Sequence, residues 1–165
     1  MLSRTVLLAF TALLSTAIAA SRTPDFTGVG QIRTLYIGTG HEDLGCLTST
    51  GKWTIDESQC GTFAAAKAND NSFHLFATEE GGCGIDVATF KCGGGVKGGT
   101  FGTFGTTGPI PGREVLRYAQ YGVLATDAAD SPPSLKEEAL DLHFYSGSEQ
   151  GKWVWLGWKP LHEEE

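Results

Sequence analysis

The sequence has little positive charge, and after its first twenty residues it has no long apolar run. Its 165 residues include 12 lysines and arginines against 19 aspartates and glutamates, a formal net charge of −7. A protein that follows nucleic-acid phosphates needs a basic face, so this balance argues against nucleic-acid binding. No later apolar stretch approaches the ~20 residues that span a bilayer, and we therefore expect no membrane partner.

Motifs for catalysis, metal binding and cofactor binding are also missing. The chain contains no G-x-S-x-G nucleophile elbow, no H-E-x-x-H zinc motif and no C-x-x-C pair. Gly93, Gly95 and Gly98 match G-x-G-x-x-G, but residues 99–105 form helices poorly, and a dinucleotide site needs a helix there. We therefore expect no cofactor and no metal ion, and we interpret the glycine-rich stretch as a flexible connection between strands.

The few histidines are weak candidates for acid–base chemistry. His41 is followed by Glu42 and Asp43 in a glycine-flanked polar turn, without a second histidine at metal-ligand spacing. His74 and His143 alternate with apolar neighbours, and we expect both on solvated strand faces. The pattern favours a protein without catalytic residues, and a hydrolase that acts through His41 or the acidic pairs is the alternative.

The N-terminus has the pattern of a secretory signal peptide. Arg4 supplies a positive start, residues 6–14 are almost entirely apolar, and Ala17-Ile18-Ala19 is a small-x-small cleavage site. We predict that residues 1–19 are removed and that residues 20–165 form one secreted domain. We expect this domain to be a monomer.

Secretion would also determine the chemistry of the four cysteines. Thiols oxidise outside the cell, so Cys46, Cys60, Cys83 and Cys92 predict two disulfides rather than a zinc site. Four cysteines allow three pairings, and spacing alone cannot choose among them. We favour Cys46–Cys60 with Cys83–Cys92, because each local bridge would close a short two-strand excursion and stabilise it by roughly 3 kcal/mol.

Most of the remaining pattern predicts β-strands bounded by glycine-rich turns. Strands are expected over residues 31–37, 44–49, 52–55, 73–78, 87–92, 115–119, 122–126, 140–145 and 152–158. Residues 63–68 fit a helical turn or a buried strand, and residues 134–137 resemble a helix capping box. We predict an all-β domain: a single antiparallel β-sandwich or small β-barrel, with two disulfides and at most one short helix.

Tryptophans are the best candidates for ligand binding. Trp153 and Trp155 share one face of an expected strand, and Trp53 stands beside a predicted hairpin turn. Amphipathic indole rings can stack on the faces of sugars, so these three residues form a candidate ligand platform. Packing of the same rings in the core is the alternative, and the pattern favours it.

Seven short motifs around the cysteines and aromatic residues occur in a specific order. They are Gly45-Cys-Leu47, Gly51-Lys-Trp53, Cys60-Gly-Thr-Phe63, Phe73-His-Leu75, Gly81-Gly-Cys83, Phe90-Lys-Cys92 and Leu156-Gly-Trp158. In this order the chain resembles the C-terminal domain of fungal ribonuclease T2-like proteins over residues 31–161. The resemblance implies an accessory, non-catalytic β-domain. The family's catalytic domain carries motifs of the types His-Gly-Leu-Trp-Pro and His-Glu-Trp-x-Lys-His-Gly, and neither occurs here.

These observations predict a secreted, non-catalytic domain that binds at the cell surface or in the extracellular space. The expected partner is cell-wall polysaccharide or a host extracellular component. The alternatives are a hydrolase for RNA or glycan, and an effector or antigen without a small ligand. Two titratable side chains that converge in a pocket would favour the hydrolase.

Overall fold

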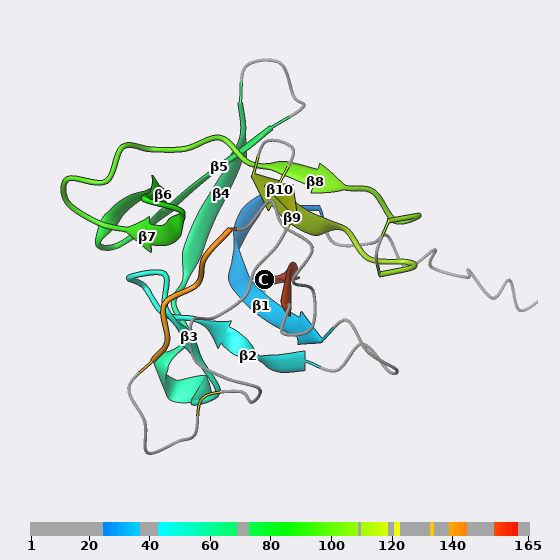
Figure 1. The fold of residues 1–165 in the computed structure, drawn as a ribbon, viewed down its shortest axis with the longest axis horizontal. Coiled ribbons are helices and arrows are strands. Elements are labelled where there is room, and N and C mark those ends of the chain that lie inside the picture. The colour runs from blue at the N-terminus through cyan, green and yellow to red at the C-terminus, as the bar shows by residue number, and fades with distance from the viewer. Residues whose placement is uncertain are drawn as a thin grey trace, which may run out of the picture.

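The protein is almost entirely β in the part of the chain that the computed structural model describes, which comprises residues 25–36, 43–68, 73–108, 110–118, 121–122, 133, 139–144 and 154–161. These residues form eleven strands and one short 3-10 helix, η1 (Figure 1). The expectation of an all-β fold is confirmed. The elements are β1 (Gly28–Tyr36), β2 (Asp43–Leu47), β3 (Trp53–Thr54), η1 (Glu57–Gln59), β4 (Phe63–Lys67), β5 (His74–Thr78), β6 (Gly81–Asp86), β7 (Thr89–Cys92), β8 (Gly102–Phe104), β9 (Val115–Tyr118), β10 (Tyr121–Gly122) and β11 (Val154–Pro160).

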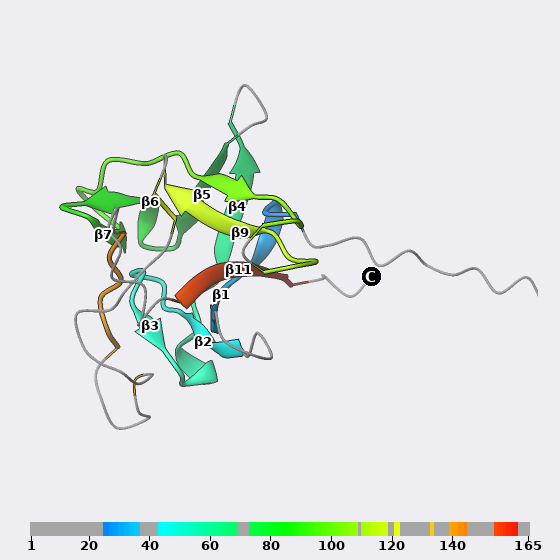
Figure 2. The same cartoon turned by 45° about the vertical axis from the view of Figure 1, so that its right-hand side comes forward.

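Eight strands form one antiparallel sheet that curls around the core (Figure 1). Their order is β3-β2-β1-β4-β5-β6-β7, and β11 pairs with β1 from outside this path. On β1, β11 occupies one edge from Gly30 to Tyr36, while β4 and β2 share the other edge. The strands β10-β9-β8 form a second, smaller sheet, and β9 lies beside β11 (Figure 2).

Two hairpins show how local sequence sets the turns. The predicted turn at Gly51 joins β2 to β3, and this glycine has a φ of +92°. The hairpin of β6 and β7 is less conventional, because Val87 and Ala88 form its turn with φ of 46° and 65°. Side chains with a Cβ rarely adopt such angles, and a β-branched residue does so least often. The strand predicted over residues 87–92 therefore begins only at Thr89.

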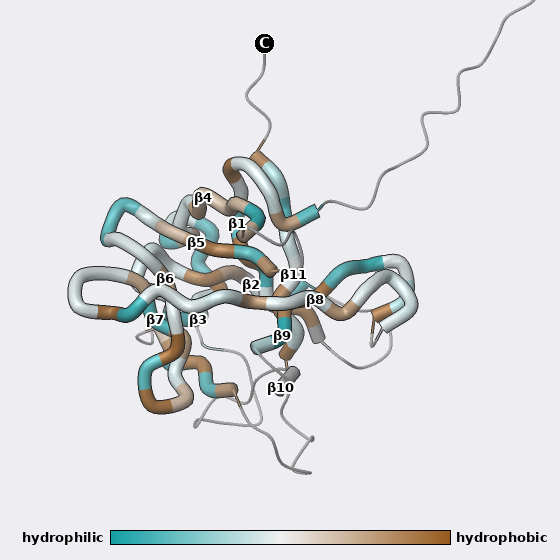
Figure 3. The backbone as a smooth tube through the Cα atoms, turned by 90° about the horizontal axis from the view of Figure 1, so that it is seen from above, coloured by the Kyte–Doolittle hydropathy of each residue, from teal (hydrophilic) through white to brown (hydrophobic). Residues whose placement is uncertain are grey.

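The core is built largely from aromatic rings. Phe26 contacts Trp158 with ring centroids 5.7 Å apart, and Phe76 contacts Phe101 at the same separation. Phe101 in turn contacts Phe90 at 5.5 Å, which links β5 to β7 through one continuous cluster. Hydrophobic segments, coloured brown in Figure 3, accordingly run along β5 toward the centre of the molecule.

The solvated position predicted for His74 is wrong. His74 is 4% exposed and Phe76 is also buried, whereas Leu75 on the opposite face is 41% exposed. Both faces of this strand carry apolar residues, so alternation alone did not identify the inner face. His74 is accepted inside because its Nδ1 lies 2.8 Å from the Phe26 carbonyl oxygen, and buried polar groups require such partners.

Residues 139–144 cross two strands of the main sheet. Leu140 bridges to Trp53 of β3, and His143 bridges to Thr89 of β7. Leu142 is buried, while His143 is half-buried, with its Nδ1 3.0 Å from the Thr89 hydroxyl oxygen. The predicted alternation of buried and more exposed side chains is therefore present. The segment, however, pairs with the sheet through isolated bridges rather than as a full strand.

The glycine-rich stretch is more regular than predicted, because it contains β6. A Cβ at Gly84 would lie 2.1 Å from the carbonyl oxygen of Lys97, so only glycine lets residues 97–99 pack against this strand. The Gly99 amide then donates to the Cys83 carbonyl oxygen at 2.9 Å. The predicted signal peptide (1–19), the helix expected at 134–137 and most of the strand expected at 122–126 lie outside the described residues.

Both disulfides have the pairing favoured from the sequence. Cys46 of β2 is bonded to Cys60, which directly follows η1, and Cys83 of β6 is bonded to Cys92 of β7. Cys83 and Cys92 stand directly opposite each other in the β6–β7 register. Each bridge therefore joins neighbouring elements, as expected for local cross-links in a small β-domain.

Candidate functional site

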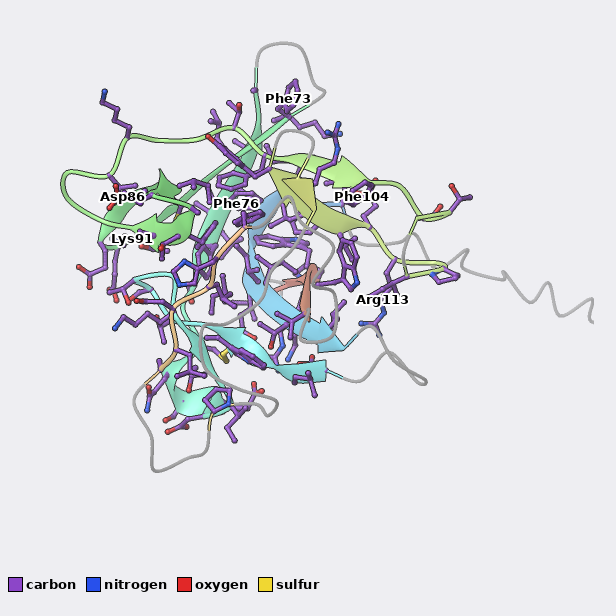
Figure 4. All side chains as sticks on the ribbon, in the orientation of Figure 1. Phe73, Phe76, Asp86, Lys91, Phe104 and Arg113 are labelled. Atoms are coloured by element: carbon purple, nitrogen blue, oxygen red, sulfur yellow. A yellow bond between two sulfur atoms is a disulfide. The ribbon has the colours of Figure 1, made fainter. Side chains whose placement is uncertain are left out.

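A cleft of about 420 Å³ opens beside the β1–β11 ladder. One side is formed by β1, β2 and β11, and the other by the turn that leads into β9, where Arg113 is labelled in Figure 4. Sites for small ligands usually measure about 300–1,000 Å³, so the cleft has a suitable size. Its lining residues are Arg33, Leu35, Asp43, Gly112, Arg113, Glu114, Gly157, Trp158, Lys159 and Pro160.

Arg33 is the buried charged group of the cleft, with 8% of its side chain exposed. Its Nε and Nη2 donate to Asp43, and its Nη1 and Nη2 donate to Glu57. The Nε–Oδ2 distance to Asp43 and the Nη1–Oε2 distance to Glu57 are both 2.9 Å. Nη1 also donates to Gln31 Oε1 at 3.1 Å, so every N–H of the guanidinium has an acceptor. Arg33 therefore holds the wall together and has no donor left for a ligand.

A β-bulge places Asp43 against this arginine. Arg33 is opposite Cys46 while Leu35 is opposite Asp43, so β2 contains one residue more than β1 over this interval. Gly45 lies within the bulge at a φ of +120°, and its amide donates to Asp43 Oδ1 at 3.0 Å. Bulges re-aim side chains next to functional sites, and this bulge directs a carboxylate at the guanidinium.

The ion pairs keep this cluster charged. The hydrogen bond with Glu57 is the largest cause of the raised pKa of Arg33, and the same hydrogen bond holds the pKa of Glu57 below its usual range. The carboxylates of Asp43 and Glu57 remain 43% and 61% exposed, so water still solvates them. The cluster is thus a partly solvated ion-pair network in which only the cation is buried.

Arg113 and Lys159 differ from most described cations of the protein, because they form no salt bridge, although the charge of Lys159 lowers the pKa of Glu57. Both are exposed, and within the described ranges neither side chain forms a salt bridge within 4.0 Å. Among the described lysines and arginines, only Lys97 shares this condition. Two of the three described cations that form no salt bridge therefore lie at one cleft.

Glu114 is the acidic group on the turn side of the cleft, and it is half-buried. Burial is the main cause of its raised pKa, and the negative charge of Asp25 raises the pKa further. The charges of His74 and Lys67 act in the opposite direction. The carboxyl group of Glu114 thus takes up a proton more readily than an exposed glutamate does.

A second cleft of about 460 Å³ lies beside Cys60, one of the two cysteines of the Cys46–Cys60 disulfide. Its lining is polar, with hydroxyl, amide and carboxyl groups and no aromatic ring: Ser49, Ser58, Gln59, Cys60, Gly61, Thr62 and Glu79. Ligand sites usually combine apolar surface with a few polar groups. The first cleft meets that description better, because Leu35, Trp158 and Pro160 contribute to its lining.

The candidate tryptophan platform lies in the interior as far as it is described. Trp53 is 3% exposed and its Nε1 donates to the Leu44 carbonyl oxygen at 3.0 Å. Trp155 is 5% exposed and packs edge-on against Phe104 with ring centroids 5.7 Å apart. Neither ring is available to stack on a sugar, which favours the core-packing alternative for both. Trp153 lies outside the described residues.

The candidates for acid–base and metal chemistry do not form a cluster in the described structure. His41 lies outside it. His74 is enclosed in the aromatic core, where its ring stacks on Phe76, and His143 lies beside Thr89 of β7. No group of three or more His, Cys, Asp or Glu side chains that could hold a metal ion occurs among the described residues.

Sequence reasoning missed most of the residues at the first cleft. Arg33 had a readable signal, because it is the only charged residue in the strand Gly28–Tyr36 and a charge in a buried strand requires partners. Arg113, Glu114 and Lys159 had none, since isolated charged residues are ordinary on protein surfaces. Their proximity depends on how β9 and β11 pack.

A comparison with models of protein families identifies the family of this chain. One family model matches residues 25–132, more than half of the chain, and it describes the RNase T2-like C-terminal domain. The chain belongs to this family. The match confirms the resemblance seen in the sequence motifs, and the matched part of this RNase T2-like C-terminal domain includes both disulfides. Strand β11, which completes the first cleft, follows the matched region.

Two further comparisons concern the RNase T2-like C-terminal domain as a whole. Searches of curated proteins and of solved structures found no match to the chain.

In the described ranges, no helix has the length and apolar character needed to cross a membrane.

Proposed function

We propose that this RNase T2-like C-terminal domain is an extracellular, non-catalytic binding module whose ligand is a segment of cell-wall polysaccharide. The cleft beside β11 is the binding site. The observation that carries this proposal is the composition of the cleft, where apolar lining from Leu35, Trp158 and Pro160 adjoins the polar groups of Arg113, Glu114 and Lys159. A sugar has apolar ring faces and hydroxyl groups at its edges, and such a mixed lining suits both.

An extracellular location is supported by the cross-links. All four cysteines of the chain are paired in two disulfides, and disulfides persist in oxidising compartments. The signal-peptide pattern of residues 1–19 supports the same location. Expression of the full chain, followed by N-terminal sequencing of the protein in the medium, tests it, and retention of residues 1–19 on an intracellular product would contradict it.

The binding proposal is tested by a titration that also locates the site. The purified protein is mixed with soluble fragments of wall polysaccharides while its backbone amide signals are followed by NMR. We expect shifts concentrated at Gly112 and Gly157 of the first cleft, with Gly61 of the second cleft unaffected. Absence of binding to every soluble fragment and every insoluble wall fraction would refute the proposal, and shifts confined to Gly61 would refute the assignment of the site.

Glycan hydrolysis is a second candidate, favoured by the two carboxyl groups that line the same cleft. Glu114 has a raised pKa, as a general acid requires, and Asp43 is the other carboxyl group. Both oxygens of Asp43 accept hydrogen bonds from Arg33, however, which makes this carboxylate a weak base. Release of reducing ends that is lost in Glu114→Gln would establish hydrolysis, whereas binding without release supports a binding module.

A further inference from the structure

The lining of the first cleft has one more cation than carboxylate, because Arg33, Arg113 and Lys159 stand against Asp43 and Glu114. Arg33 is paired with Asp43 and with Glu57, so its donors are occupied, and the charge of Lys159 also acts on Glu57, whose pKa it lowers. Arg113 and Lys159 form no salt bridge among the described residues, and Glu114 lines the cleft with them. In a chain of formal net charge −7, a rim with an excess of positive charge is unexpected.

The two cations come from different parts of the fold. Lys159 is on β11, opposite Gln31 in the β1–β11 register, and Arg113 is on the turn just before β9. Arg113 lies on the far side of the molecule from the β6–β7 hairpin that carries Asp86 and Lys91 (Figure 4). An anion in the cleft could therefore be contacted from both sides, and among the described residues neither cation is held in a salt bridge.

We propose that the cleft selects carboxylated polysaccharide, with Arg113 and Lys159 binding the carboxylate of a uronate unit; this inference rests on the proposed function. A uronate supplies one negative charge for the two cations, an apolar ring face for the lining near Trp158, and hydroxyl groups that donate to Glu114. Inorganic phosphate would leave the apolar lining unused, and its second negative charge would be repelled by Glu114.

The test compares two oligosaccharides that differ only in the carboxylate. An α-1,4-linked galacturonate trisaccharide and the matching galactose trisaccharide are titrated into the full protein by calorimetry at low and moderate salt. We expect the uronate to bind at least about tenfold more tightly than the galactose trisaccharide. The reason is that each hydrogen bond between a cation and a carboxylate increases the affinity by about tenfold or more. Added salt should reduce the difference, since the rim is exposed.

Matched variants connect the preference to the cleft. Arg113→Ala with Lys159→Ala should abolish the preference for uronate. Lys52→Ala with Lys97→Ala removes the same amount of positive charge away from the cleft and should preserve the preference. Lys159→Arg should also preserve the preference. All four side chains are exposed, so the variants should unfold at the same temperature as the parent protein.

Each outcome decides one proposal. Equal binding of the two trisaccharides, unaffected by the cleft variants, would overturn the uronate inference and leave the polysaccharide-binding proposal intact. Equally tight binding of inorganic phosphate or of a polyglutamate peptide would also overturn it, because the site would then recognise charge alone. Absence of binding to both trisaccharides and to all wall fractions would refute the proposed function itself.

Discussion

Replacing Arg33 with methionine tests whether the ion-pair cluster stabilises the β1–β2 wall of the cleft. Methionine keeps an unbranched apolar stem in the buried position and removes all donors to Asp43 and Glu57. The perturbation therefore separates the electrostatic contribution of Arg33 from the packing of its side chain. Arg113→Met is the matched control, because Arg113 is exposed and has no salt bridge within the described residues.

The expected magnitude follows from the exposure of the partners. Hydrogen bonds to charged groups contribute about 1.5–3 kcal/mol each when they are well shielded. Here the carboxylates of Asp43 and Glu57 are 43% and 61% exposed and would regain water in the variant. For this reason we take the contribution of each bidentate ion pair to the free energy of unfolding as about 1–1.5 kcal/mol. The two pairs together predict a loss of about 2–3 kcal/mol for Arg33→Met.

The free energy of unfolding is measured by urea denaturation at neutral pH, with circular dichroism as the signal. The control Arg113→Met should change it by less than about 0.5 kcal/mol. A loss for Arg33→Met no larger than that of the control would refute a stabilising role for the cluster. A double-mutant cycle with Glu57→Gln adds a second test, because additive effects would show that the two side chains do not interact.

The same variant gives a pH dependence of defined sign. Arg33 lowers the pKa of Glu57 in the folded state, so the ion pair contributes fully above the unfolded pKa of about 4.3. The contribution is lost as the pH falls through the folded pKa. The difference in stability between the parent protein and Arg33→Met should therefore shrink as the pH falls below the unfolded pKa, and a difference that grows toward acid would contradict the assignment.

Three further changes test local backbone geometry and cross-linking, each by urea denaturation. Gly45→Ala should lower the free energy of unfolding by about 3 kcal/mol or more, because φ is +120° and a Cβ would lie 2.1 Å from a backbone oxygen. Gly94→Ala is the control and should leave the free energy of unfolding unchanged, since nothing lies within 4 Å of its Cβ position. Ala88→Gly should stabilise the protein by about 1 kcal/mol by relieving its positive φ, and a loss would argue against that turn. Cys46→Ser with Cys60→Ser should cost about 3 kcal/mol, and an unchanged denaturation midpoint would show that the bridge does not stabilise the fold.

The strands that were predicted best from the sequence are bounded by clear turn residues or are rich in residues that favour strands. The β2–β3 hairpin was found from the turn signal at Gly51, and the closing strand β11 was found from its aromatic and β-branched residues. β5 was located, but its inner face was assigned wrongly, since both faces are apolar and the sequence does not show that His74 has a partner at Phe26. β6 was missed because its glycines resemble a loop until residues 97–99 are packed against them.

The sequence by itself determined the all-β class and the family and favoured the local disulfide pairing, because each depends on residues that are close together in the chain or on their order. Only the tertiary structure decided that Trp53 and Trp155 belong to the interior and that a cleft exists. The cleft unites Arg33 of β1, the turn at Arg113 and Lys159 of β11. Contacts between such distant segments depend on the packing of whole sheets, which local periodicity does not encode.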